Sequence, residues 1–271
     1  ANAVVDGTLA IPAGIKLESK GHTINGSIRM LGDLELVDEL TITGGLWVGK
    51  SGETMTATLS GEKLTASYFM FQHGTYTINA DIDAVYGYLS FNGTFEVNST
   101  IHTTGANGEV LYINGNVTLN NGAVLDSDNS VFLSNDSAVL TMMPGSKVDS
   151  NLNLTKSGAK LYIDANGLTT GKYTGITGTV TNSGTIEVIN NDKLEANIVN
   201  GKVVLKRILP GDGSQDNPYI IDSVEDLIFF RDSVNAGETK YNAPGVYVAL
   251  GADIDLNNTV WTEGIGDGQN W

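Results

Sequence analysis

Two pairs of aspartates are the residues of this chain whose types and spacing could support chemistry. Asp126 and Asp128 lie in the run LDSDNS, and Asp81 and Asp83 lie in NADIDA. Residues two apart on a strand point to the same face, so each pair could act as acid and base or bind calcium. In so acidic a chain, solvated turn aspartates are the simpler interpretation. We therefore predict no catalytic residue and no metal ligand, and keep these four aspartates as the candidates to check.

The residues that usually assist such carboxylates are sparse. A polysaccharide lyase needs an Arg or Lys base, but the only arginines, Arg29, Arg207 and Arg231, are far from both pairs in sequence. The three histidines, His22, His73 and His102, lack metal-ligand spacing, so each is interpreted as a surface or packed residue. No Ser-His-Asp signature and no phosphate-binding loop occurs. These observations predict a non-catalytic chain without a cofactor.

Aromatic residues concentrate in one third of the chain. They are Tyr68, Phe69, Phe71, Tyr76, Tyr86, Tyr88, Phe91 and Phe95. Rings stacked on an outer face could bind sugars, and Tyr68, Tyr76, Tyr86 and Tyr88 are the candidate ligand contacts. Inward rings forming a core stack are the simpler explanation.

The elements that must position these residues repeat along the first two hundred residues. Pairs of apolar residues with period two, the pattern of a strand with one buried face, recur roughly every 19 to 25 residues. The pairs are Leu9/Ile11, Leu34/Leu36, Ala57/Leu59, Tyr76/Ile78, Phe95/Val97, Val117/Leu119, Leu140/Met142, Leu161/Ile163 and Ile186/Val188. A repeat of this length is typical of a solenoid.

Each repeat contains two further apolar positions. The first follows the pair after a corner, as at Ile101 and Val124, and the second is a patch such as SVFLS at 130–134. Three strands per coil predict an all-β fold, a right-handed parallel β-helix in which Leu119, Leu140 and Leu161 share one interior column. The Asn-Gly dipeptides would also suit the hairpins of a β-sandwich, which is the alternative fold.

The pattern changes after residue 208. LPGDGS at 209–214 is a Pro/Gly break that reads as an inter-domain linker. Ser223 with Asp226 three residues later predicts a helix start, with Val224, Leu227, Ile228 and Val234 on its apolar stripe. Gly237 marks the end of the helix, and GVYVAL at 245–250 predicts a strand. We predict a β-helix over 1–208 and a small α+β module over 209–271.

The second segment resembles the module that opens β-helical regions in bacterial surface proteins with GLUG-type repeats. The matching residues are GDGSQDNPYII, the helix start SVEDL, the strand YVALGADIDL and a Trp followed by Ile-Gly. WTEGIG at 261–266 has Glu-Gly where that family typically has Pro. The resemblance implies that 209–271 begins a second β-helical region of a longer polypeptide.

Composition limits the partners. The 271 residues carry a formal net charge of −16 and no cysteine. Nucleic acids and anionic membranes need a basic face, so neither is expected as a partner. No apolar run approaches the length of a membrane span, and no signal peptide is recognisable at the start.

These observations together predict a non-catalytic, structural or adhesin-like segment of an exported bacterial surface protein. Surface glycans or proteins are its expected partners. The alternative is a carbohydrate-active or carbohydrate-binding β-helix, because pectin-type lyases and hydrolases share this fold. Attachment to a surface peptidase is a third hypothesis, although the chain contains no His-Glu-x-x-His zinc sequence.

Overall fold

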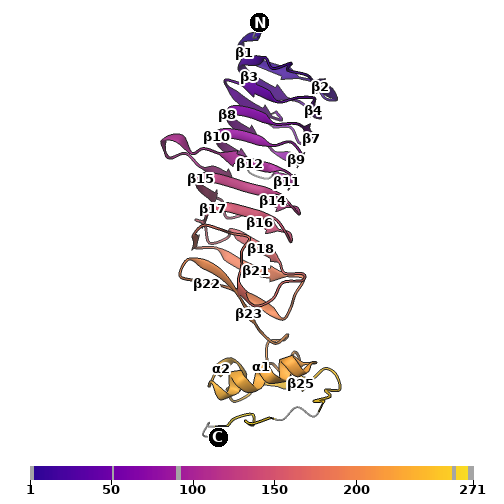
Figure 1. The fold of residues 1–271 in the computed structure, drawn as a ribbon, viewed down its shortest axis with the longest axis vertical. Coiled ribbons are helices and arrows are strands. Elements are labelled where there is room, and N and C mark those ends of the chain that lie inside the picture. Colours follow the sequence, from indigo (N-terminus) through magenta and orange to yellow (C-terminus); the bar gives the residue numbers. More distant parts are fainter. Residues whose placement is uncertain (1–2, 51, 90–92, 258–260, 268–271) are drawn as a thin grey trace. The chain divides into compact units, whose positions relative to one another are not determined.

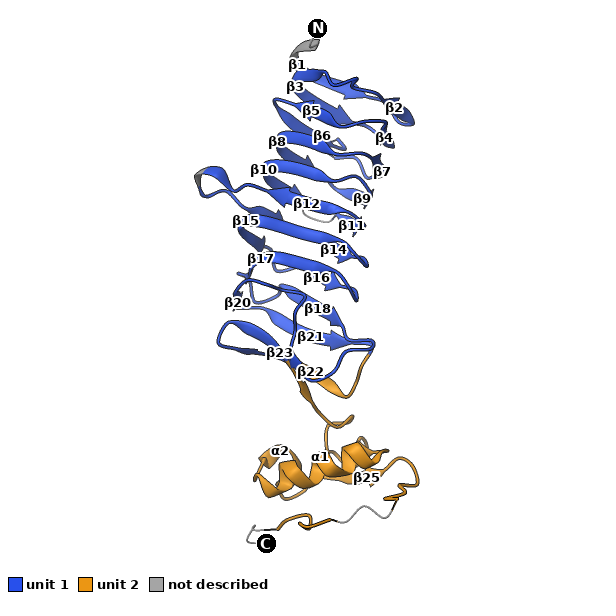
Figure 2. Cartoon of the chain, viewed as in Figure 1, with its two compact units in different colours: residues 1–190, 196–204 blue, residues 191–195, 205–271 orange. Residues whose placement is uncertain are grey.

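The computed structural model describes residues 3–50, 52–89, 93–257 and 261–267. The chain forms two compact units, shown in different colours in Figure 2. The first comprises Ala1–Asn190 and Ala196–Val204, and the second comprises Asn191–Glu195 and Leu205–Trp271. Neither of the two α-helices among the described residues has the length and hydropathy of a transmembrane span.

The first unit is a β-solenoid of about eight turns built from parallel strands, as Figure 1 shows. One sheet has nine strands: β2 (Ile15–Leu17), β4 (Leu34–Leu36), β7 (Met55–Gly61), β9 (Gly74–Ile78), β11 (Thr94–Val97), β14 (Asn116–Leu119), β16 (Val139–Met142), β18 (Lys160–Asp164) and β21 (Thr185–Ile189). The other has eleven: β1 (Ala3–Ile11), β3 (Thr23–Met30), β5 (Leu40–Ile42), β6 (Gly45–Val48), β8 (Leu64–Phe71), β10 (Ile82–Leu89), β12 (Thr100–Thr103), β13 (Leu111–Ile113), β15 (Val124–Leu133), β17 (Lys147–Leu154) and β20 (Val180–Asn182). The solenoid prediction is confirmed, whereas its right-handedness stays a prediction.

The predicted three strands per coil merge in part. In β8 the buried and outward positions alternate on both sides of two successive half-buried residues, Ser67 and Tyr68. Two outward residues in a row mark a bend, so one long strand covers two of the predicted faces. In the preceding coil the same two faces are formed by two separate strands, β5 and β6, which both pair with β8.

The interior is filled by columns of apolar side chains in parallel register. Val117, Leu140, Leu161 and Ile186 are successive register partners. Leu119 pairs with Met142, so it lies one column away from Leu140 and Leu161. The prediction of a shared column was therefore wrong for Leu119, although all three leucines are fully buried. Leu119 is the second residue of its apolar pair, whereas Leu140 and Leu161 are the first residues of theirs, and residues two apart on a strand share the inner face but lie in adjacent columns.

The two ends of the solenoid depart from the regular pattern. The pair Leu9/Ile11 was expected to align with Leu34/Leu36, but it belongs to β1 of the eleven-stranded sheet. The strand that pairs with β4 in the nine-stranded sheet is β2. A three-stranded sheet is ordered β19 (Gly171–Lys172), β23 (Lys202–Arg207) and β22 (Leu194–Val199).

The second unit contains the predicted helix, α1 (Val224–Asn235), a short α2 (Thr239–Asn242), and strands β24 (Tyr219–Ile221) and β25 (Val248–Leu250), which pair in parallel. The Ser223 hydroxyl accepts a hydrogen bond from the Asp226 amide, so the N-cap prediction is confirmed. The predicted stripe is confirmed for Val234, which is buried, and for Leu227, which packs against the core, while Asp226 and Ser233 are buried in addition.

The segment 209–214 is part of this second fold. Leu209 is fully buried in a cluster with Tyr219 and Tyr241, and its amide donates a hydrogen bond to the Tyr241 hydroxyl. The Pro210 and Gly213 carbonyls accept hydrogen bonds from Ile220 and Tyr247. The backbone groups of this segment are therefore paired within the second unit, and the predicted boundary at residue 208 stays a prediction.

Candidate functional site

Three polar residues follow one another across adjacent strands on the outer face of the eleven-stranded sheet. Asp83 of β10, His102 of β12 and Asp126 of β15 are register partners. Parallel in-register strands hold such partners about 4.8 Å apart, so their side chains are forced to meet. The His102 Nδ1 atom lies 3.0 Å from a carboxylate oxygen of Asp126. Its Nε2 atom lies 4.0 Å from a carboxylate oxygen of Asp83.

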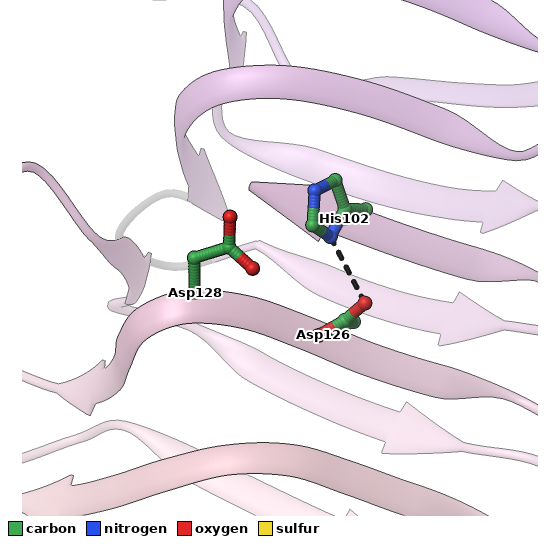
Figure 3. A group of neighbouring side chains, drawn as sticks. All are labelled: His102, Asp126 and Asp128. Carbon is green, nitrogen blue, oxygen red and sulfur yellow. Dashed lines mark hydrogen bonds and ion pairs between the residues drawn. The ribbon is translucent and has the colours of Figure 1, made fainter. Parts of the chain in front are cut away.

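Asp128 joins this group because it faces outward two residues after Asp126, with the buried Ser127 between them. Between Asp126 and Ser130 the register against β17 shifts, since Asp126 faces Asp149 while Ser130 faces Asn151. Figure 3 shows Asp128 and Asp126 on either side of the His102 ring. One ligand atom from each of the three residues lies within 4.8 Å of the others.

The other two candidate aspartates have different surroundings. Asp83 pairs with the Lys63 ammonium at 2.8 Å, and this hydrogen bond is the main cause of a raised pKa for Lys63. Asp81 accepts a hydrogen bond from the Thr100 amide at 2.8 Å, which ties one coil to the next. The structure thus brings Asp83, Asp126 and Asp128 close to one histidine and leaves Asp81 in a structural role.

His102 was missed because of a register error of one residue. The sequence repeat sets Ile101 opposite Val124, but in the structure Ile101 pairs with Leu125. The sequence repeat would place His102 beside Leu125, whereas the structure places it beside Asp126. A slip of one residue exchanges the inner and outer faces of a strand.

The sequence contained a signal against this alignment. Asp126 and Asp128 share one face of the strand, so Leu125 lies on the other, inner face, opposite Ile101.

Aromatic side chains form a second feature of the same outer face. The outer aromatic row consists of Trp47, Tyr68, Tyr86, Tyr88, Tyr112 and Phe132, all half-buried. Tyr68 stacks on Tyr86 with 5.3 Å between ring centroids, and Tyr88 stacks on Tyr112 at 4.7 Å. Burial is the main cause of a raised pKa for the Tyr88 hydroxyl, with the neighbouring Tyr112 next. Stacked rings cover each other's faces. The solvent-accessible parts of the row are therefore the ring edges and the tyrosine hydroxyls.

The aromatic candidates are divided between this row and the core. Tyr76 is buried against Phe71 and Phe95, and burial raises its pKa to about 12. A surface ligand contact for Tyr76 does not fit this position. Tyr68, Tyr86 and Tyr88 point outward, and the core-stack interpretation does not hold for them. Phe91 lies outside the described residues.

The second unit contains a buried cluster of charges. The Asp226 carboxylate is inaccessible to solvent and pairs with Arg207 and, at 2.8 Å, with Lys193. Burial by itself raises the pKa of Asp226, but hydrogen bonds from Lys193, Ser223 and Arg207 outweigh it and hold the pKa well below its usual range. This cluster anchors the first turn of α1 and is interpreted as structural.

Comparisons with protein-family models, with curated proteins and with solved structures find no match to this chain.

Proposed function

We propose that this chain is a non-catalytic, structural or adhesin-like β-solenoid segment of a bacterial surface protein. The solenoid itself is the observation that supports the proposal. Its apolar columns and continuous parallel ladders make a stiff body, and they present long, flat outer faces to partners. The bacterial surface location rests on the GLUG-type resemblance of 211–266.

Two hollows among the described residues lack the pair of carboxylates that a glycosidase uses. A hollow of the first unit is lined by Val180, Asn182, Ile186 and 196–198, with no titratable side chain. A hollow of the second unit, lined by Leu227 and residues near 250–256, has the single carboxylate of Asp253. Neither unites two carboxylates around a space for a sugar ring, which a glycosidase requires.

Incubation with a panel of acidic and neutral polysaccharides tests this proposal. We expect neither unsaturated nor reducing-end products at any pH between about 5 and 9. Products that vanish in both Asp126→Asn and Asp128→Asn would establish a carbohydrate-active enzyme in its place. The His73→Gln variant, changed at an exposed histidine, serves as the matched control.

The outer aromatic row favours a second candidate function, polysaccharide binding. Tyr88, Tyr112 and Phe132 are consecutive register partners, and their ring centroids lie 4.7 Å and 6.1 Å apart. A polysaccharide chain along the row would contact ring edges and tyrosine hydroxyls, an apolar and polar combination suited to sugars.

Affinity electrophoresis in gels containing polysaccharide tests this candidate. We expect retardation of the wild-type protein and a loss of at least tenfold in affinity for Tyr112→Ala. The control is Tyr162→Ala, which removes a half-buried outward tyrosine of the other sheet. Equal retardation of the two variants would exclude the row as the binding surface.

A further inference from the structure

We propose that His102, Asp126 and Asp128 bind a divalent transition metal ion on the outer face of the solenoid. The proposal goes beyond the structural function and does not depend on it. One nitrogen and two carboxylate oxygens are a donor set that suits Zn²⁺, Co²⁺ or Ni²⁺. Calcium is disfavoured, because it takes oxygen ligands and this site contributes an imidazole nitrogen.

The distances fit a shared ion. The His102 Nδ1 atom and the nearest Asp126 oxygen are 3.0 Å apart. An ion bonded at ~2.1 Å to both atoms would have an angle of about 90° between these bonds, within the range of octahedral coordination. Asp128 brings its oxygen to within 4.8 Å of the other two ligand atoms, so a small side-chain rotation completes a set of three.

The backbone makes this arrangement specific. His102 and Asp126 are held side by side by the parallel ladder between β12 and β15. Thr103 and Ser127, the next residues of the same strands, are buried and hydrogen-bonded to each other at 2.9 Å. This inward bond fixes the outward direction of the two ligands before it. Asp128 faces the same way as Asp126, because the buried Ser127 is the one residue between them.

A second carboxylate supports the imidazole from the other side. Asp83 lies 4.0 Å from Nε2, the ring nitrogen that would not bind the ion. This distance is too long for a hydrogen bond, but a small approach would let the second N–H donate to Asp83, as metal-binding histidines commonly do to a carboxylate that orients the ring. Lys63 holds Asp83 in place at 2.8 Å. Asp83 is therefore a positioning residue, and Asp149, the register partner of Asp126, adds negative charge nearby.

The alternative is an ion-pair ladder without metal, in which a protonated His102 bridges Asp83 and Asp126. Both arrangements use the same column of register partners, but they differ in the role of Asp128. A metal site needs this third ligand, whereas the bridge between Asp83 and Asp126 does not.

Titration of untagged, chelator-treated protein with Zn²⁺ tests the proposal by calorimetry. We expect one saturable site in the wild-type protein, its loss in His102→Gln, and affinity at least tenfold weaker in Asp128→Asn. Asp83→Asn should weaken binding about tenfold, the lower end of the effect of losing such a supporting carboxylate. The controls His73→Gln and Glu53→Gln should bind as the wild type does. No saturable binding, or equal binding by His102→Gln, would overturn the proposal.

A measurement on the wild-type protein guards against misfolded variants. Co²⁺ at one equivalent should broaden or shift the NMR signals of residues near His102, Asp126 and Asp128 before others. Effects spread over acidic residues throughout the chain would show non-specific attraction of cations to a protein of net charge −16 and would contradict the site.

Discussion

Leu140 shows how a single inward side chain is held in the solenoid. It is fully buried between its register partners Val117 and Leu161. The ladders above and below fix the backbone, so neighbours cannot move in to fill a cavity. Replacing Leu140 with Ala should therefore cost about 2 to 5 kcal/mol of unfolding free energy.

Urea denaturation followed by circular dichroism measures this loss. Thr141→Ala, which shortens the adjacent half-buried outward side chain, is the control and should change stability by less than about 0.5 kcal/mol. Equal effects of the two substitutions would mean that the column does not contribute as described.

Asp226 is the residue whose charge matters most to the second unit. Replacing it with Asn leaves Lys193 and Arg207 without their shared carboxylate. Both cations keep part of their hydration, so the expected loss is about 2 to 4 kcal/mol, at or below the usual cost of breaking a buried pair. Amide hydrogen exchange in α1 measures the loss. Asp232→Asn, at an exposed ion pair, is the control and should have little effect.

The same carboxylate gives the second unit a defined pH dependence. The pKa of Asp226 is lower in the folded than in the unfolded chain, so its contribution is present above the unfolded value of about 3.9. This contribution should be lost as the pH falls below about 4. Exchange protection of α1 should then decrease more steeply in the wild type than in Asp226→Asn. Parallel pH profiles would contradict this assignment.

At the scale of the elements, small residues make room for large ones in the neighbouring coil. Gly87 of β10 is the register partner of Phe69 of β8, and a Cβ atom built on Gly87 would lie 2.0 Å from the Phe69 ring. Gly87→Ala should therefore cost about 1 to 3 kcal/mol through overpacking. Thermal unfolding measures the effect.

A second substitution separates overpacking from other causes. In the Phe69→Leu background the smaller side chain leaves space, so Gly87→Ala should be less destabilising there than in the wild type. Additive effects of the two substitutions would show that the ring is not responsible.

The helix shows the limit of element prediction from periodicity. Its start at Ser223 and its end before Gly237 follow from local chemistry, and both are found. Its buried face includes the predicted Val234 but also Asp226, because the partners of Asp226 are cations at positions 193 and 207. From the sequence alone a carboxylate is assigned to the solvent-facing side of a helix. Only the fold shows that Lys193 and Arg207 lie beside Asp226 and allow its burial.

At the scale of the whole molecule, the boundary predicted at residue 208 can be tested through these charges. A fragment of 209–271 contains Asp226 but lacks Lys193 and Arg207. A buried carboxylate without cations is destabilising, so Asp226→Asn should increase the helicity of the fragment while it weakens α1 in the full chain. Circular dichroism of the fragment and hydrogen exchange of the full chain measure the two effects. The same sign in both would show that the two cations are dispensable.

The sequence by itself determined the solenoid, the apolar faces of most strands and the cap of α1. These features depend on periodicity and on contacts within a few residues, which a sequence displays directly. Only the tertiary structure decided the register between coils, and with it the neighbours of Leu119, His102 and Asp226. His102 and Asp126 are separated by 24 residues, and a slip of one residue in alignment replaces the carboxylate by Leu125. The outward or inward direction of each tyrosine likewise depends on where a strand bends, because alternation restarts at every bend.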